Sequence, residues 1–467
     1  MAFTTDVMER GRTVLRRDAR AEARALARLA RGAATRGGAK CGSSRVLLLQ
    51  GPVGPFFTTL RRALAARDIE TRQIAFNAAD LAFAEPFGTD VFRGRERAWR
   101  AHLRGVLDAW RPDIVVLFGC ERVRHAVARK MCHARSIPVL SLEEGYVRPG
   151  FVTAEWGGNN RRSPLADASP ERIAELARHE KPQAAAPSSF GRMAWFSFLY
   201  YVARTLGLPI MRHSIHHKRR PLVRETVFWL RSAWRKVTRA RGNRRLVDWL
   251  LEHQRDNFVV VPLQVRDDMQ LEKAGRGWTN ERVIDRAIAS FARHAPDERV
   301  LVFKVHPLER GHCNAIERVT QVAARHGVAD RVFAIDDGSI GLVVSASAGM
   351  VTINSTSAFS ALLRGVPLCV LGDAMFRRPE LAWCVETIED LDRFWTAGRP
   401  PAGQDAHTFR EAMMRSALVP GDFYLSRGRR VAANNIAQMI EERLSPAHPE
   451  RVAIADSPRA ERVADPA

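Results

Sequence analysis

Cysteine is scarce in this 467-residue chain, and its six cysteines include no CxxC pair. That spacing argues against a zinc site and a disulfide framework, and it favours a reducing compartment. A secretory signal is also missing, because acidic residues interrupt the segment 1–40 where an apolar core is required. The longest apolar run, 194–203, is too short to cross a bilayer. We therefore expect a soluble or peripheral protein.

Acidic residues are few relative to basic ones: 51 Asp and Glu stand against 73 Lys and Arg, giving a net charge of +22. Such an excess favours an anionic partner, namely nucleic acid, a phospholipid surface or a phosphate-bearing substrate. An Arg-rich composition tolerated at exposed positions would explain it equally simply. The chain has no nucleic-acid-binding motif, and its basic residues are not interleaved with stacking aromatics, so we expect no nucleic acid partner.

Short apolar runs alternate with helical segments through most of the chain. This alternation predicts βαβ units and parallel sheets. It falls into two halves separated by a helical middle, which predicts a GT-B-like α/β fold with two Rossmann-type domains whose parallel sheets face a central cleft. The predicted strands are 45–50, 71–76, 113–118, 138–142, 258–264, 300–305, 332–335, 350–353 and 366–371.

The same pattern gives expected boundaries. An Arg-rich helix and linker at 1–44 precede an N-terminal Rossmann-like domain at 45–205. A basic helical connector at 206–255 leads to a C-terminal Rossmann-like domain at 256–400. The last parts are C-terminal helices at 401–445 and a disordered tail at 446–467.

The connector carries an apolar stripe at helical spacing beside a basic flank. This pattern suits a helix at a membrane interface, and core packing explains the stripe equally well. We favour core packing for the stripe, with the charges in solvent or among lipid headgroups. The stripe consists of Val223, Val227, Leu230, Trp234 and Val237, and the flank of Arg231, Arg235, Lys236 and Arg239.

Polar clusters follow four of the predicted strands, at the carboxyl ends where open α/β sheets bind ligands. The first contains Gly51 and Gly54, which would let backbone amides approach an anionic ligand. The sequence there is neither GxGxxG nor a Walker A loop, and a tight structural turn explains it as well.

The second cluster holds two adjacent carboxylates, Glu143 and Glu144, with Arg148 close behind. Mutual repulsion can raise the pKa of one carboxyl towards a value suited to a general base. Neighbouring residues of a strand point to opposite faces, so we expect one of the two to enter the cleft. An exposed acidic turn is the alternative. Arg148 would orient an acidic substrate.

The third and fourth clusters carry groups suited to phosphate. Lys304 and His306 end an apolar strand and can hydrogen-bond a phosphate and neutralise a leaving group. The run 354–357 offers hydroxyls and free amides at the start of a helix, although helix capping alone would explain it.

With its four clusters in this order, the chain resembles the capsule polysaccharide synthesis family, and the resemblance covers residues 46–424. The matching segments, in order, are LLLQGPVGPFF, FNAAD, LFG, EEGYVRPGFVTAEWGGN, HSIHH, VPLQVRDD, FKVHPLERGH, INSTSAFSALLRGVP, LGDAMF and GDFYLSRGRR. The chain has room for one transferase module, so it is similar to the single-module members. The family commonly has FGDCR, a second His before His306 and a GVNxxS-like stretch. This chain has FGCER, Val305 and the segment 158–163 at those places.

The resemblance implies transfer of 3-deoxy-manno-octulosonic acid (Kdo) from CMP-Kdo to a lyso-phosphatidylglycerol acceptor. It places the protein in the cytoplasm, on the inner face of the inner membrane, with other capsule assembly or export proteins as further partners. The N-terminal domain would bind the acceptor and the C-terminal domain the CMP-sugar. A transferase for another nucleotide sugar and a non-catalytic export scaffold are the alternatives.

The resemblance also implies the site. Glu144 is the first choice for the catalytic carboxylate because it lies nearest the turn, and Glu143 is the second. No metal or other cofactor is expected. The donor-binding residues implied are Gln264, Lys304, His306, Pro307, Asn354, Ser355 and Thr356. The remaining substrate-binding residues implied are Gly51, Gly54, Arg148, Asn160, Ser163 and Arg310.

Overall fold

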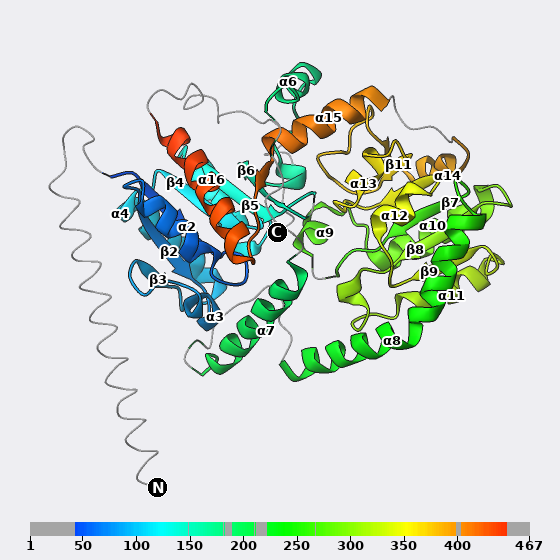
Figure 1. The fold of residues 1–467 in the computed structure, drawn as a ribbon, viewed down its shortest axis with the longest axis horizontal. Coiled ribbons are helices and arrows are strands. Elements are labelled where there is room, and N and C mark those ends of the chain that lie inside the picture. Colours follow the sequence, from blue (N-terminus) through cyan, green and yellow to red (C-terminus); the bar gives the residue numbers. More distant parts are fainter. Residues whose placement is uncertain are drawn as a thin grey trace, which may run out of the picture.

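The computed structural model places two α/β domains side by side, each built on its own sheet (Figure 1). It describes residues 43–147, 149–180, 182, 189–209, 211, 222–266, 268–397 and 403–445. The expected N-terminal helix, Arg148 and the expected disordered tail lie outside the described residues.

The first sheet has seven strands in the order β13-β6-β5-β4-β1-β2-β3. The run β3-β2-β1-β4-β5 is parallel, and β6 and then β13 extend it in antiparallel fashion. The strands are β1 Arg45–Leu48, β2 Glu70–Ala75, β3 Thr89–Val91, β4 Ile114–Phe118, β5 Val139–Glu144, β6 Phe151–Trp156 and β13 Leu418–Pro420. The helices between them are α2 Phe56–Ala65, α3 Ala78–Ala82, η1 Glu96–Ala98, α4 Trp99–Trp110 and α5 Val123–His133.

The second sheet has six parallel strands in the order β12-β11-β10-β7-β8-β9. Counted within the domain, this is the doubly wound order of a Rossmann fold. The strands are β7 Phe258–Pro262, β8 Val300–Lys304, β9 Val332–Ile335, β10 Gly349–Thr352, β11 Leu368–Val370 and β12 Trp383–Cys384. The helices are α9 Met269–Ala274, α10 Asn280–His294, η3 Pro307–Glu309, α11 Ala315–Arg325, α12 Ile340–Ser345, α13 Ala358–Leu362 and α14 Ile388–Ala397.

Two Rossmann-type domains in one chain make the GT-B arrangement, so the predicted fold class is confirmed. The central strands explain why the sequence predicts it. All five residues of β4 and of β8 are buried, because helices cover both faces of a parallel sheet. Each strand therefore appears in the sequence as a continuous apolar run.

The chain returns to the first domain after the second sheet is complete. The helix α15, Gly403–Ser416, leads to β13, which pairs with β6, and then to α16, Ser426–Leu444. The helix α16 packs on α2 (Figure 1), and the ring of Phe423 lies 4.7 Å from that of Phe56. The last part of the chain thus completes the N-terminal domain and carries Tyr424 to the end of β5.

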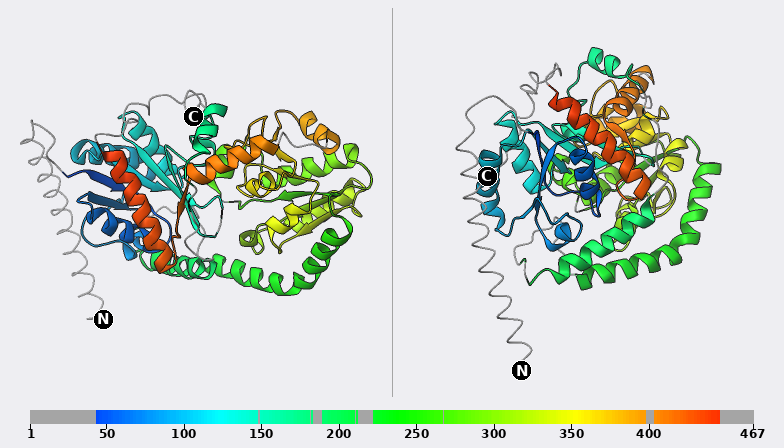
Figure 2. Two further views of the ribbon diagram at one scale, coloured as in Figure 1. Left: turned by 45° about the horizontal axis from the view of Figure 1, so that its top comes forward. Right: turned by 60° about the vertical axis from the view of Figure 1, so that its left-hand side comes forward.

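Two helices, α7 (Phe190–Leu206) and α8 (Leu222–His253), connect the domains along one edge of the molecule (Figure 2). Two short elements, η2 (Asn160–Arg162) and α6 (Pro170–Leu176), precede them. No helix within the described ranges is both long enough and apolar enough to span a membrane.

The prediction that the apolar stripe of the connector packs in the core is wrong. Trp234 and Val237 are 65% and 77% exposed, and Val227 and Leu230 are exposed as well. The side chain of Val223 lies outside the described residues. The basic flank was expected to lie in solvent or among lipid headgroups. This prediction is wrong for Arg235, whose side chain is buried.

The reason is that α8 packs on the C-terminal domain through a polar face. Arg235 Nη1 donates to the carbonyls of Arg310 and Cys313, at 2.7 and 2.6 Å. One and two turns further on, Arg239 and Asn243 bind the carboxylate of Asp336, at 3.0 and 2.7 Å. These groups recur every four residues, so the face that they form has the same helical period as the apolar stripe.

Candidate active site

Three strand ends of the first sheet bring Gln50, Arg122 and Glu143 to its carboxyl edge. Because β1 and β4 are neighbours in the sheet, the residues that follow them meet: Arg122 Nη1 donates to Gln50 Oε1 at 3.0 Å. The Arg122 guanidinium also lies over the ring of Phe118, 5.0 Å from its centroid. An arginine is thus held rigidly beside the end of β5.

Glu143 has an environment suited to proton transfer. Burial raises the pKa of its carboxyl to about 7, Arg122 acts in the opposite direction, and Asp268 and Glu144 raise it further. A carboxyl that titrates near neutral pH is matched to the work of a general base. Asp268 lies in the loop after β7, so a charge of the second domain acts on Glu143.

Glu144 points elsewhere, as expected for neighbouring residues of a strand. Its Oε1 accepts a hydrogen bond from the hydroxyl of Tyr424, just after β13. The next residue, Gly145, has no room for a side chain, because a Cβ there would lie 2.3 Å from the carbonyl oxygen of Phe151. The two carboxylates therefore have different neighbours: the charge of Arg122 acts on Glu143, and Tyr424 donates a hydrogen bond to Glu144.

Behind Gln50 lies a buried polar network that the sequence analysis did not identify. The hydroxyl of Tyr200, in α7, donates to Asp80 Oδ1 at 2.8 Å and accepts from Asn77 Nδ2 at 2.7 Å. Gln50 Nε2 donates to both oxygens of Asp80, at 3.1 and 3.2 Å. Burial raises the pKa of Asp80, and hydrogen bonds with its neighbours partly offset that effect. The network fixes α7 against the strand ends.

A second buried carboxylate, Glu155 in β6, lies close to the domain boundary. The hydroxyl of Tyr146 donates to Glu155 Oε2 at 2.5 Å, and the Ser163 hydroxyl donates to Oε1. Burial raises the pKa of Glu155 to about 7, and these hydrogen bonds act in the opposite direction. Ser163, predicted to bind substrate, is thus buried with its hydroxyl directed at Glu155.

Asn160 joins the two domains. Its Nδ2 donates to the backbone carbonyl of Asn354 at 3.2 Å, and its Oδ1 accepts from the backbone amide of Met375 at 3.4 Å. Its own amide donates to the hydroxyl of Tyr146 at 2.7 Å. Asn160, also predicted to bind substrate, therefore contacts the loop that contains the predicted donor-binding residues.

Gln264 and Asn354 meet at the switch point of the second sheet, where β7 and β10 are neighbours. Gln264 Nε2 donates to Asn354 Oδ1 at 2.8 Å, and Gln264 Oε1 accepts from the Asn354 amide at 3.2 Å. Both side chains are buried. Their amides fix the two loops that border the crevice in which such sheets bind ligands.

Lys304 and Arg310 both reach the loop that follows β9. Lys304 Nζ donates to the carbonyl of Asp337 at 3.2 Å, and Arg310 Nη2 donates to the carbonyl of Asp336 at 2.5 Å. Burial lowers the pKa of Lys304. The structure brings these two predicted residues together, and it directs Arg310 into the protein.

His306 and Pro307 begin the short helix η3. His306 Nδ1 accepts a hydrogen bond from the Leu308 amide at 3.2 Å, so the neutral ring carries its proton on Nε2. The predicted hydroxyls lie after β10, where Ser355 Oγ is 2.9 Å from Ser357 Oγ and Thr356 is half-buried.

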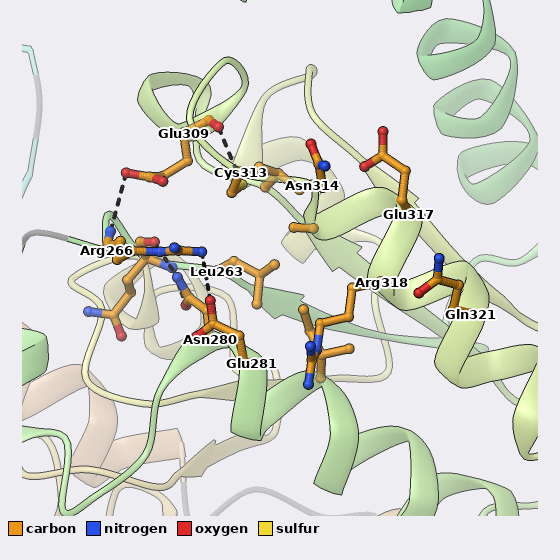
Figure 3. Close-up of a pocket in the computed structure, with 14 residues that line it drawn as sticks. Leu263, Arg266, Asn280, Glu281, Glu309, Cys313, Asn314, Glu317, Arg318 and Gln321 are labelled. Carbon is orange, nitrogen blue, oxygen red and sulfur yellow. Dashed lines mark hydrogen bonds and ion pairs between the residues drawn. The ribbon is translucent and has the colours of Figure 1, made fainter. Parts of the chain in front are cut away.

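A cavity of about 300 Å³ opens beside the ends of β7 and β8, between α10 and α11 (Figure 3). Gln264 and Arg266 line it. Arg266 Nη2 donates to Glu281 at 2.7 Å, and its backbone amide donates to Glu309 at 3.2 Å. The volume is at the lower end of the range of ligand sites. The cavity lies on the domain that the sequence assigns to the donor.

The two predicted glycines differ in their surroundings. Gly54 has φ +100°, and a Cβ there would lie 3.0 Å from the ring of Phe196 in α7. Gly51 has its closest neighbour in Phe57, 2.9 Å from the position of a Cβ. Gly54 is therefore covered by α7, so its role in the structure is to allow that helix to approach the loop after β1.

A family model described as "Capsule polysaccharide biosynthesis protein" matches residues 113–424. The chain belongs to this family. Among its relatives, the "Capsule polysaccharide modification protein LipB" of Neisseria meningitidis is 29% identical over 389 residues, which are 82% of this chain and 92% of LipB. The "Capsule polysaccharide export protein KpsS" of Escherichia coli is 28% identical over 382 residues, which are 81% of this chain and 97% of KpsS.

A solved structure in the comparison is that of KpsC from Thermosulfurimonas dismutans, a "beta Kdo 2,7 transferase". It is 12% identical to this chain, with a TM-score of 0.40 over 85% of this chain and 99% of KpsC. The predicted resemblance to the capsule family is confirmed by the family match and by these relatives.

Three residues of this capsule-family protein belong to the site although they were not predicted for it. Arg122 lies in FGCER, where the chain departs from the family pattern, and Asp80 lies in the matching segment FNAAD; a charged residue after a strand was a usable signal in both. Tyr200 gives no such signal, since it occurs within an apolar helix. Across the described ranges, no three His, Cys, Asp or Glu side chains gather in a way that would hold a metal ion.

Proposed function

We propose that this protein is a glycosyltransferase that moves Kdo from CMP-Kdo to a (lyso)phosphatidylglycerol acceptor, starting the linker of a capsular polysaccharide. The observation that carries the proposal is Glu143: a carboxyl with a pKa of about 7, at a strand end of the first domain, on which the charge of Asp268 in the second domain acts. Membership of the capsule biosynthesis family and the GT-B arrangement support it.

Glu143 is the proposed general base. It accepts the proton of the acceptor hydroxyl as that oxygen bonds to the anomeric carbon of Kdo and CMP departs. The geometry favours Glu143 over Glu144, because Glu144 is engaged by Tyr424 and Glu143 lies beside Arg122. Arg122 limits how far the pKa of Glu143 rises, so a useful fraction of the base is ionised at neutral pH.

The donor would lie against the second domain. His306, with its proton on Nε2, and Lys304 would donate to the CMP phosphate, and Ser355 and Thr356 would complete the phosphate pocket. Charged and polar side chains of this kind neutralise a leaving phosphate without a metal ion. Gln264 and Asn354 would hold the loops that border the donor, since their amides bind each other.

The proposal includes a location and partners. The acceptor is an anionic phospholipid, so the protein would work in the cytoplasm, on the inner face of the inner membrane, beside other capsule assembly proteins. The basic balance of the chain fits this, because each Lys or Arg near an anionic bilayer contributes about 1 kcal/mol. A transferase for another nucleotide sugar is the second candidate.

The decisive experiment measures release of CMP from CMP-Kdo by purified protein, with lyso-phosphatidylglycerol as acceptor. Acceptor-dependent release by the wild type, lost in Glu143→Gln, supports both the reaction and its base. Release that survives in Glu143→Gln assigns the base elsewhere, with Glu144 next. Folded protein that releases no CMP contradicts the CMP-Kdo reaction. The next hypotheses to test would be a transferase for another nucleotide sugar and then a non-catalytic export scaffold.

A further inference from the structure

Exposed apolar side chains gather on one edge of the molecule. In the part of the chain that the structure describes, thirteen large hydrophobic side chains are exposed, and ten of them belong to α7, the turn after it or α8. Their exposed fractions run from 45% to 77%. They are Phe190, Trp195, Phe198, Leu206, Leu208, Val227, Trp229, Leu230, Trp234 and Val237.

The two helices that carry these side chains are neighbours in the structure. They contact each other, and both views of Figure 2 show them along the same edge, beneath the first domain and then the second. Neither helix needs its apolar stripe to hold it in place. The polar face of α8 binds the C-terminal domain through Arg235 and Asn243, and Tyr200 fixes α7 to Asp80. The apolar side chains are thus available to a partner.

The segment of α8 that carries the apolar stripe has charges of one sign. From 226 to 247 the chain has seven Lys or Arg residues and no Asp or Glu, and α7 likewise contains no acidic residue. Lys236, Arg241, Arg244 and Arg245 are exposed beside the apolar stripe. Helices that lie in the interface of an anionic bilayer combine Trp, Phe and Leu with a basic flank.

We propose that the edge formed by α7 and α8 docks on an anionic phospholipid bilayer. The aromatic and aliphatic side chains enter the boundary between headgroups and acyl chains, and the flanking cations contact lipid phosphates. The same helix α7 carries Tyr200 on its inner side, so the docked edge and the strand ends near Glu143 are joined by one rigid element. In the light of the proposed function, this brings the site to the surface that contains its acceptor.

The test is co-sedimentation of the full-length protein with vesicles, without any sugar donor. Wild type is expected to bind vesicles of phosphatidylglycerol and phosphatidylcholine, more weakly at high salt, and to bind phosphatidylcholine alone poorly. The double variant Trp234→Glu/Val237→Glu is expected to lose about tenfold or more in affinity, since each buried apolar side chain contributes more than 1 kcal/mol. Trp195→Glu/Phe198→Glu should behave likewise.

Leu342→Glu is the matched control, because Leu342 is 50% exposed on α12 and belongs to neither α7 nor α8, so its replacement should leave binding unchanged. The variant Arg244→Glu/Arg245→Glu keeps the apolar side chains and should lose the preference for phosphatidylglycerol. Thermal melting checks that each variant is folded. Equal binding by wild type and both aromatic variants, or no binding by wild type, overturns the proposal. So does a wild-type dimer that the same variants dissociate, because the edge would then be an interface between two copies.

This result is separable from the transfer reaction. CMP release is measured with lyso-phosphatidylglycerol dispersed in detergent, where docking is not required. The variants at Trp234 and Val237 should retain it there. Vesicle binding without any CMP release would leave the docking edge intact and contradict the proposed reaction.

Discussion

The side chain of Asn160 crosses the boundary between the two domains and donates to the backbone carbonyl of Asn354 at 3.2 Å. With its Oδ1 it also accepts from the amide of Met375, so one buried side chain satisfies two backbone groups of the second domain. Its φ of +52° lies in the left-handed region, where asparagine is tolerated better than most residues. The residue is therefore suited to hold the domains in register.

We expect Asn160→Ala to lower the free energy of unfolding by about 2 kcal/mol or more. Two buried backbone groups lose their partners, and a Cβ-bearing residue without a polar side chain is strained at this φ. Asn160→Gly removes the same hydrogen bonds without the strain, so the difference between the variants measures the strain. Denaturant melts check this. An unchanged stability with a raised KM for the donor would instead indicate that Asn160 binds substrate directly.

The two carboxylates at the end of β5 should respond differently to the same change. Glu143→Gln removes the proposed base and should lower kcat by about 10²–10⁴-fold. Glu144→Gln retains an oxygen that accepts from Tyr424, so its effect on kcat should be small. Tyr424→Phe removes that hydrogen bond, and its effect on kcat should also be small because Glu144 is not the proposed base. The measurement is steady-state CMP release by all three variants. A large loss in Glu144→Gln alone would return the catalytic role to Glu144.

The rate of CMP release should increase with pH. A base must be deprotonated, and the pKa of Glu143 is about 7, so kcat/KM should rise as the pH rises through about 7. Arg122 holds that pKa down. Its replacement by methionine should move the midpoint to higher pH, whereas Arg122→Lys keeps a positive charge and should move it less. A midpoint that stays fixed in Arg122→Met would assign the titration to another group.

The sequence predicts the central strands and long helices of the fold well because their signals are local. The strand expected at 300–305 is β8, Val300–Lys304, and the buried strand β4 is a continuous apolar run. The antiparallel strands β6 and β13 were not predicted. They pair across more than half of the chain, and each is stabilised by a partner that no short segment reveals.

The candidate site was predictable only in part, for the same reason. Glu143, Lys304 and His306 stand at strand ends, where a polar residue after an apolar run is a visible signal. The raised pKa of Glu143 depends on burial in the folded protein, and the Tyr200–Asp80 hydrogen bond depends on where α7 packs. The prediction that the apolar stripe of the connector packs in the core was wrong for another reason. The apolar and polar faces of the connector have the same helical period, so hydrophobicity alone selected the wrong one.

Stability should fall as the pH rises from about 5 to about 8. The folded-state pKa values of Glu143 and Glu155 are both raised to about 7, above the value near 4.3 of an unfolded glutamate. Their contribution to stability is complete below the unfolded value and is lost as the pH rises through the folded value. Glu143→Gln cannot ionise, so it should be more stable than wild type at pH 8 and similar at pH 5. Urea titrations at both pH values check this, and an equal difference at both would contradict it.

Replacement of Gly54 tests how closely α7 must approach the loop after β1. Gly54→Ala places a Cβ at φ +100°, which costs about 1–2 kcal/mol, and only 3.0 Å from the ring of Phe196. Gly327→Ala is the matched control, since it also has a positive φ, of +69°, with nothing within 4 Å of a Cβ. Gly54→Ala should therefore destabilise the protein more than Gly327→Ala does. Adding Phe196→Ala should reduce the penalty of Gly54→Ala, because the ring is then absent. Equal penalties for both glycines, unaffected by Phe196→Ala, would mean that α7 moves aside without loss.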